Sequence, residues 1–190
     1  DVARRKEVLL GTNQYPNINE KAADKIKTGG CCSCCCGSEE KGEHALIAKR
    51  AATDFEDLRL ATEASARRPK VFMLTIGNLA MRLARAQFST NFFGCAGYEI
   101  VDNLGFDTVE DGINAALAQN ADVIVLCSSD DEYATLAPEA FRFLDGRAEF
   151  VVAGAPACME DLQKEGITNF VHVRCNVLDT LRAFNAKLLK

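Results

Sequence analysis

The chain has 190 residues, 48% of them apolar, so it can bury one hydrophobic core with a tail or linker but hardly two full domains. It carries 22 basic and 27 acidic residues, a formal net charge of -5, without long basic runs. That balance gives no electrostatic footprint for nucleic acid or an anionic membrane. No apolar run reaches membrane-spanning length and no signal peptide is evident. We therefore expect a cytoplasmic protein with protein or small-molecule partners.

The first residues predict the tail of another domain. The chain begins with Asp1 rather than Met, which fits a piece of a longer protein. Residues 8–11, Val-Leu-Leu-Gly, are predicted to form a short strand that has no partner strand nearby. Because an isolated strand is not stable alone, we interpret residues 1–16 as the remnant of an upstream domain. Residues 17–69 are interpreted as a linker with a cysteine-rich loop and a helix.

Five of the nine cysteines crowd into one short stretch, at Cys31, Cys32, Cys34, Cys35 and Cys36. Thiolates spaced as Cys-x-x-Cys can chelate zinc or an iron-sulfur cluster, and His44 downstream could add a ligand. All five sulfurs lie in one glycine-flanked loop without a separate second pair, so we favour a flexible, oxidisable loop that holds no metal. The remaining four cysteines are predicted to be reduced packing residues: Cys95, Cys127, Cys158 and Cys175.

The rest of the chain predicts an α/β domain over residues 70–190. The charge-rich residues 43–68 are interpreted as a helical linker packed on a neighbour. From residue 71 onward, five short β-branched runs alternate with amphipathic stretches, which is the rhythm of a doubly wound parallel sheet. The predicted strands are 71–76, 99–102, 123–127, 150–153 and 169–173. Right-handed crossovers and short loops favour the strand order 2-1-3-4-5.

Apolar stripes and capping residues predict the helices between these strands. The stripes are Ala84, Phe88 and Phe92; Val109, Ile113 and Ala116; and Val177, Leu181, Phe184 and Leu188. Thr108 and Asn176 stand where they can cap the helices that follow them, and Gly166 can close the fourth helix.

Two stretches resemble the small subunit of methylmalonyl-CoA mutase. Residues 68–72, Arg-Pro-Lys-Val-Phe, followed by Asn-Phe-Phe at 91–93 and by Gly97 and Glu99, are similar to the first strand and helix of its flavodoxin-like, cobalamin-binding-like domain. Residues 5–15 are similar to the closing strand of the mutase barrel. The resemblance implies a barrel remnant over residues 1–16, then the linker, then the cobalamin-binding-like domain.

The family implies a heterodimer. Its large subunit binds adenosylcobalamin and isomerises methylmalonyl-CoA to succinyl-CoA by a radical route, while the small subunit supports it. In cobalamin-binding members, the loop after the first strand carries Asp-x-His-x-x-Gly, in which His ligates cobalt, Asp orients the imidazole and Gly admits the nucleotide tail. On that register Leu79 replaces Asp, Met81 replaces His and Ala84 replaces Gly. We expect apolar side chains to fill the vacated slot and no cobalamin to bind.

Three other positions depart from a cofactor site or fit it weakly. Ser128 survives from the family's Ser-x-Leu, but Asp130 replaces the leucine. The acidic loop could hold a divalent cation, and we favour helix capping instead. Gly154 and Ala155 stand where binding members have a glycine pair. His172 on the last strand is expected to be hydrogen-bonded, without catalytic partners at a suitable spacing.

These residues together predict part of a non-catalytic small subunit with a degenerate cobalamin site. The chain itself is expected to bind no cofactor and no metal, and its expected partner is the large subunit. One alternative is the cobalamin-binding domain of a catalytic mutase. Another is a metal or redox module built on the cysteine-rich loop. Flavin or nucleotide binding stays open on grounds of fold alone, although no glycine-rich phosphate loop follows the first strand.

Overall fold

A computed structural model describes residues 1–21 and 50–189, and the five clustered cysteines and His44 lie outside these ranges. Five strands form one sheet: β1 (Lys70–Thr75), β2 (Glu99–Val101), β3 (Val123–Cys127), β4 (Glu149–Ala153) and β5 (Phe170–Val171). All neighbours pair in parallel, in the order β2-β1-β3-β4-β5. The predicted sheet and strand order are therefore confirmed. The last strand is shorter than predicted, because the chain turns after Val171.

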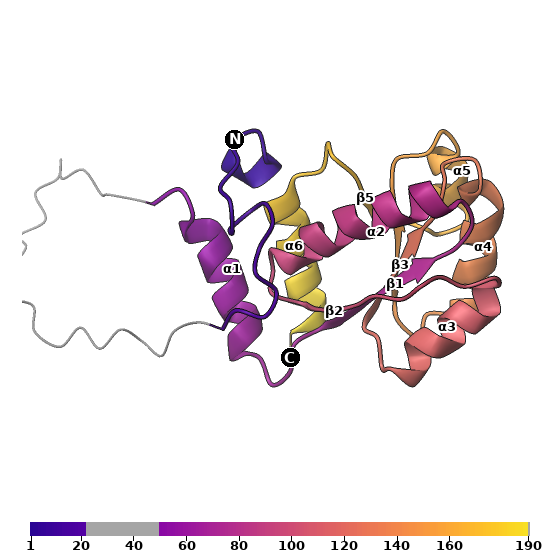
Figure 1. Ribbon diagram of the computed structural model, residues 1–190, viewed down its shortest axis with the longest axis horizontal. Coiled ribbons are helices and arrows are strands. Elements are labelled where there is room, and N and C mark those ends of the chain that lie inside the picture. Colours follow the sequence, from indigo (N-terminus) through magenta and orange to yellow (C-terminus); the bar gives the residue numbers. More distant parts are fainter. Residues whose placement is uncertain (22–49, 190) are drawn as a thin grey trace, which may run out of the picture.

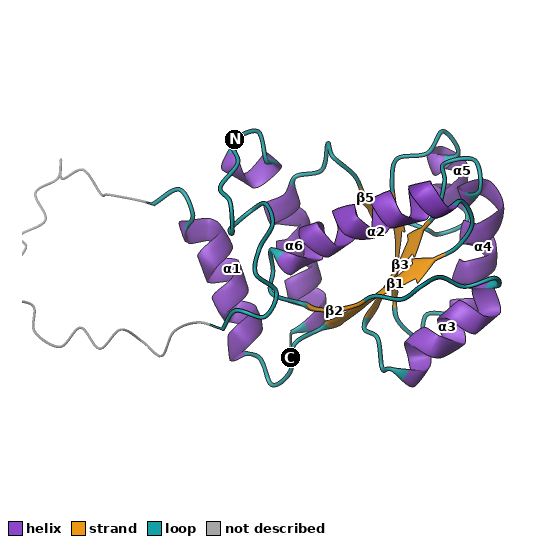
Figure 2. Ribbon diagram, viewed as in Figure 1, coloured by secondary structure: helices purple, strands orange, loops and turns teal. Residues whose placement is uncertain are grey.

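Helices cover both faces of the sheet (Figures 1 and 2). The strands are followed in turn by α2 (Leu79–Gly94), α3 (Val109–Ala118), α4 (Tyr133–Leu144), α5 (Met159–Lys164) and α6 (Val177–Leu188). The side chains of Thr108 and Asn176 accept the predicted capping bonds, and Gly166 adopts a left-handed conformation with φ of 96° after α5. In the described part of the chain, no helix has the length and apolar character to cross a membrane.

Alternate residues of each strand enter two separate cores. Val71 and Met73 of β1 pack on the side of α2 and α6, whereas Phe72 and Leu74 pack on the side of α3, α4 and α5. All four side chains are fully buried. Because both faces are covered, the strands are apolar at nearly every position, as a parallel sheet requires.

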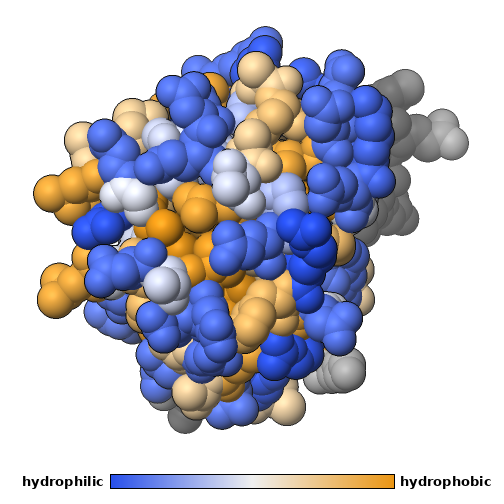
Figure 3. Space-filling view, turned by 90° about the vertical axis from the view of Figure 1, so that its right-hand side faces the viewer, coloured by the Kyte–Doolittle hydropathy of each residue, from blue (hydrophilic) through white to orange (hydrophobic). Residues whose placement is uncertain are grey.

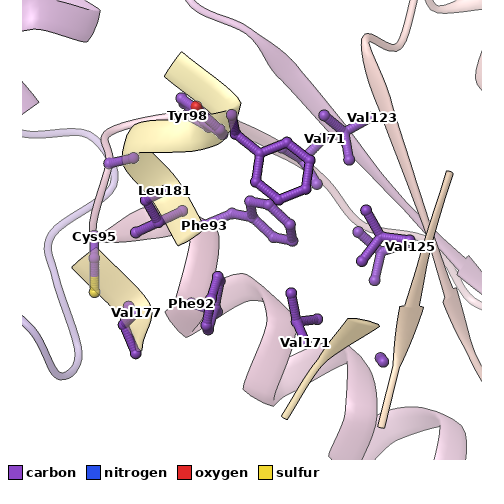
Figure 4. Packing of buried hydrophobic residues seen from close by; sticks show 14 of the residues in the cluster. Val71, Phe92, Phe93, Cys95, Tyr98, Val123, Val125, Val171, Val177 and Leu181 are labelled. Atoms are coloured by element: carbon purple, nitrogen blue, oxygen red, sulfur yellow. The ribbon is translucent and has the colours of Figure 1, made fainter. Parts of the chain in front are cut away.

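An aromatic cluster dominates the core on the side of α2 and α6 (Figure 4). The ring of Phe93 lies 5.4 Å from that of Phe92, 5.5 Å from that of Phe184 and 6.1 Å from that of Tyr98, measured between centroids. Cys95 belongs to the same cluster. The four cysteines within the described residues are free thiols, two buried and two half-buried, as predicted for packing residues.

Helix α1 (Thr53–Ala64) joins this core from outside the sheet, and it is the described part of the predicted helical linker. Its contact with α6 is built on the buried side chain of Asn185. The hydroxyl of Tyr98 donates to Asn185 Oδ1 at 2.6 Å, and Asn185 Nδ2 donates to the carbonyl of Leu58 at 3.3 Å. The neighbour on which this helix packs is therefore the chain's own α/β domain.

The N-terminal segment contains no strand at residues 8–11, so that prediction was wrong. Among residues 1–21, the extended pairing that the structure shows is a single bridge between Leu10 and Gln14, closed by a tight turn. The buried side chain of Asn13 holds the turn by donating to the carbonyls of Val2 and Glu7 at 2.8 and 3.0 Å. Because these side-chain bonds satisfy the local backbone groups, the segment needs no sheet partner.

Candidate functional site

The topology directs attention to the carboxyl ends of β1 and β3. Strand β1 lies between β2 and β3 in the sheet. The chain passes from β1 to β2 on one side and then returns to place β3 on the other side, so the direction of strand order reverses between β1 and β3. In open α/β sheets, ligands bind at such a reversal of strand order. The loop from β1 to α2 and the loop from β3 to α4 lie at this point, and the predicted degenerate positions lie in the loop after β3 (Ser128, Asp130), in the first turns of α2 (Leu79, Met81, Ala84) and after β4 (Gly154, Ala155).

The loop after β1 is a tight turn into α2. Gly77 has a φ of 78°, a conformation that side-chain-bearing residues rarely adopt. Asn78 then caps the helix, because its side-chain oxygen accepts a bond from the backbone N–H of Met81 at 3.1 Å. Leu79 and Met81 therefore lie in the first turn of α2.

The apolar residues at the degenerate positions do not fill a slot. Leu79 is 60% exposed, Leu83 is 52% exposed and Met81 is 37% exposed, and Ala84 is exposed as well. The expectation of a core-like filling was wrong, because these side chains leave the helix on its solvent side. Leu104, in the loop after β2, is 96% exposed. Figure 3 faces the side of the molecule that carries the start of α2 with α4 and α5, and apolar residues gather there among hydrophilic ones.

Polar groups occupy the space between the two loops. The hydroxyls of Ser128 and Ser129 each donate to Glu132 Oε2 at 2.6 Å. The backbone N–H of Ser129 donates to the same oxygen at 3.1 Å, and that of Asn78 does so at 3.3 Å from the opposite loop. One carboxylate oxygen thus joins the loop after β1 to the loop after β3.

These hydrogen bonds lower the pKa of Glu132 to about 2, with the hydroxyls of Ser128 and Ser129 as the largest causes. The side chain is therefore ionised at neutral pH. It lies directly against the bare backbone of Gly77, where an added Cβ would be 2.3 Å from Glu132 Oε2. Glycine at this position makes room for the chain's own carboxylate.

The predicted capping of α4 by the serine and aspartate side chains was wrong. No side chain caps that helix, because the two serine hydroxyls donate to Glu132. Asp130 instead pairs with Arg85 of α2, with Nη2 and Oδ1 2.8 Å apart. The described residues contain no group of three His, Cys, Asp or Glu side chains that could hold a metal ion.

The ion pair between Arg85 and Asp130 covers the turn after β4. Gly154 has a φ of 150°, and an added Cβ would lie 3.3 Å from both Arg85 Cζ and Asp130 Oδ1. Tyr133 closes the inner side, because its buried hydroxyl donates to the carbonyl of Ala153 at 2.6 Å and accepts from the N–H of Ser128 at 3.1 Å. The carboxyl ends of β1, β3 and β4 are thus all occupied by polar contacts within the chain.

A shallow cavity of about 300 Å³ remains beside this ion pair, and Ala155 and His172 contribute to its walls. His172 Nδ1 accepts a bond from the backbone N–H of Arg174 at 3.2 Å, so the predicted hydrogen bonding is confirmed, but His172 lies just after β5 and not on the strand. Burial and the nearby Arg174 charge lower the pKa of His172, which keeps it neutral at pH 7. The thiol of Cys175 accepts a bond from the backbone N–H of His172 at 3.4 Å, so it contacts the main chain of this histidine.

These residues do not fit cobalamin. The chain has a thioether at Met81 in place of an imidazole, and the exposed Leu79 cannot orient a metal ligand. The hydroxyl of Ser128, which would face the nucleotide tail, is already bonded to Glu132. The tail would also meet the carboxylate that lies against Gly77. No step of a radical isomerisation can therefore be assigned to these residues.

Comparison with known proteins agrees with the family resemblance. No protein-family model matches the chain. Over 187 residues, which are 98% of the chain, it is 64% identical to the methylmalonyl-CoA mutase small subunit of Porphyromonas gingivalis. The chain is homologous to part of this small subunit. It is also 31% identical over 163 residues to the methylmalonyl-CoA mutase small subunit of Streptomyces virginiae, and 29% identical over 137 residues to the probable one of Mycobacterium bovis.

The matched regions are short relative to these small subunits. The chain spans 30% of the length of the Porphyromonas gingivalis protein, 25% of the Streptomyces virginiae protein and 20% of the Mycobacterium bovis protein. The predicted relationship to methylmalonyl-CoA mutase small subunits is confirmed. That this chain binds no cofactor and no metal stays a prediction.

Two residues that organise the site, Arg85 and Glu132, were not among the predicted site positions, although Glu132 belongs to the acidic loop after β3. A signal for Glu132 was present, because Ser129 and Glu132 have the Ser-x-x-Glu spacing of a capping box, in which the carboxylate reaches back to the serine N–H. That part of the pattern is formed here. Arg85 gave no signal, because its partner Asp130 is 45 residues away in sequence.

Proposed function

We propose that this chain is part of a small subunit of methylmalonyl-CoA mutase that binds no cobalamin and stabilises the large subunit. The isomerisation of methylmalonyl-CoA to succinyl-CoA then takes place on the large subunit, which holds adenosylcobalamin. The observation that carries the proposal is the 64% identity over 98% of the chain to a protein named as this small subunit. Non-binding is supported by the poor fit of the site to the cofactor.

A docking role is supported by the exposed apolar side chains around the start of α2. Leu79, Leu83 and Leu104 each leave half or more of their surface in water. Such a group of large apolar side chains is typical of a protein interface rather than of scattered surface residues. The large subunit is the partner that the name of the Porphyromonas gingivalis relative suggests.

Co-expression with a methylmalonyl-CoA mutase large subunit tests the docking role. We expect the two chains to co-elute in size-exclusion chromatography. The double variant Leu79→Asp, Leu83→Asp should fold normally, because both side chains are exposed, and should weaken association by about tenfold or more, equal to about 1.4 kcal/mol. A matched change on another surface, Leu60→Asp on α1, where the leucine is 49% exposed, should have little effect. Absence of co-elution, or equal association of the double variant, would contradict the docking role.

Equilibrium dialysis with adenosylcobalamin tests the non-binding site. We expect no saturable binding by the unmodified chain, since within the described residues the first turns of α2 carry neither an imidazole nor an orienting carboxylate, and Glu132 lies against Gly77. The variant Leu79→Asp, Met81→His, Ala84→Gly should also fail to bind, because Glu132 still fills the crevice. It should stay folded and lose only about 1 kcal/mol, mainly from glycine inside a helix. Saturable micromolar binding by the unmodified chain would return it to the catalytic class.

A further inference from the structure

A continuous groove runs along the middle and end of α2. Three adjoining hollows of about 260, 480 and 300 Å³ form it. Tyr15 and Asn91 line both the first and the second hollow. Phe88, His172 and Val173 line both the second and the third. We name these joined hollows the α2 groove. A row of hollows matches an extended polypeptide segment, whose successive side chains can enter them, better than one compact small molecule.

The N-terminal segment forms one wall of the α2 groove and is fastened to the helix. Asn91 Oδ1 accepts a bond from the backbone N–H of Tyr15 at 2.6 Å, and the carbonyl of Asn91 accepts one from Arg5 Nη2 at 3.1 Å. The guanidinium of Arg5 also lies over the ring of Phe92, with Cζ 5.6 Å from the ring centroid. Because contacts within the chain hold both walls, the groove is formed before a partner binds, which lowers the cost of binding.

The rims of the α2 groove are apolar and exposed. Four apolar side chains there leave half or more of their surface in water: Val8, Leu10, Tyr15 and Val173. The buried side chain of Val177 contributes to the floor between them. Exposed apolar side chains that gather around a groove are typical of a protein interface.

The walls of the α2 groove carry an excess of positive charge, although the net charge of the chain is -5. Arg4, Arg5 and Arg174 line the groove, and no carboxylate of the described residues forms an ion pair with them. Asp130 lines the third hollow, but it is already paired with Arg85. Such a groove is complementary to a segment that carries both carboxylates and apolar side chains.

We propose that the α2 groove binds an extended segment of the mutase large subunit in which acidic and apolar side chains alternate. The apolar side chains enter the hollows, and the carboxylates pair with Arg4 and Arg174 at the rims. This inference deepens the proposed function and rests on it, because the large subunit is the partner. It adds a charge-dependent contact to the apolar one at the start of α2.

Charge reversal in the groove tests the proposal. The 190-residue chain is titrated with a methylmalonyl-CoA mutase large subunit at about 0.05 and about 0.5 M NaCl. The variant Arg4→Glu, Arg174→Glu should fold normally, because both side chains are exposed, and should bind about tenfold or more weaker at the lower salt. Its binding should also respond less to salt, since the attraction that salt screens is gone.

A control variant and a cross-link complete the test. Lys164→Glu, Arg182→Glu makes the same change of charge at exposed positions outside the groove and should bind as the unmodified chain does. A photoreactive benzoylphenylalanine in place of Val173 should cross-link to the large subunit. Mass spectrometry should show more acidic than basic residues in the cross-linked peptide.

Several results would overturn the inference. They are unchanged binding by Arg4→Glu, Arg174→Glu, a cross-link to a second copy of the chain, and a cross-linked peptide without an acidic excess. In each case Leu79→Asp, Leu83→Asp should still weaken association if the proposed function holds. Absence of all association with the large subunit would contradict the proposed docking role as well, so the two failures can be told apart.

Discussion

Replacing Phe93 with alanine is expected to lower the free energy of unfolding by about 3 to 5 kcal/mol, the range found for large aromatic side chains in cores. Phe93 is fully buried, and its ring contacts those of Phe92, Tyr98 and Phe184. These rings join α2 and α6 to the sheet, so the cavity would lie where three layers of the core meet (Figure 4). Urea unfolding followed by circular dichroism measures the loss.

The matched control is Phe143→Ala on α4, whose ring is only half-buried and packs beneath Arg147. It should cost clearly less than Phe93→Ala, because a partly exposed ring loses less contact area and leaves no closed cavity. Equal losses in the two variants would contradict the central role assigned to the aromatic cluster.

The variant Gly77→Ala is expected to lose about 2 to 4 kcal/mol of stability from two independent causes. An L-residue at a φ of 78° costs about 1 to 2 kcal/mol. The new Cβ would also lie 2.3 Å from Glu132 Oε2, and the carboxylate could move away only by giving up hydrogen bonds that hold it. Loss of such bonds costs about 1 to 3 kcal/mol, reduced here because the side chain is partly exposed to water.

A double-mutant cycle separates these two causes. Gly146→Ala has a similar φ of 69° with no atom within 4 Å of the added Cβ, so it should show the cost of the backbone conformation alone. In the Glu132→Ala background, Gly77→Ala should cost about as much as Gly146→Ala, because the obstructing carboxylate is gone. If Gly77→Ala costs the same with and without Glu132, the close contact between them carries no energy.

The sheet could be predicted from sequence because its information is local. Runs such as Val-Ile-Val-Leu-Cys at β3 are apolar at every position, and their short length and β-branched residues favour a strand covered on both faces. The cap residues Thr108 and Asn176 also act within three positions of themselves, so their roles were predictable from spacing. The prediction of an N-terminal strand was wrong because the conformation of this segment depends on less local contacts. The side chain of Asn13 fixes the turn by donating to carbonyls 6 and 11 residues away.

The contents of the candidate site were harder to predict. The residues Leu79, Met81 and Ala84 indicated that the aspartate, histidine and glycine of the cobalamin-binding motif are missing. They did not indicate which side chains lie between the loops after β1 and β3. Sequence alone could not show that Leu79 and Leu83 leave the helix toward solvent, because an apolar residue near the start of a helix can face either way. The groups that do fill the crevice, Glu132 and the pair of Arg85 with Asp130, come together only when β1 and β3 are side by side.

The buried amide of Asn185 decides where the cooperative folding unit begins. Its hydrogen bonds join α6 to Tyr98 before β2 and to Leu58 in α1, so the three segments share one satisfied polar group inside an apolar core. If α1 detached, the amide would lose its bond to Leu58 and the core would open to water around it. Amide protons of α1 should thus exchange through the same opening reaction as those of α6. In thermodynamic terms, the unit of unfolding starts at or before α1 rather than at the first strand.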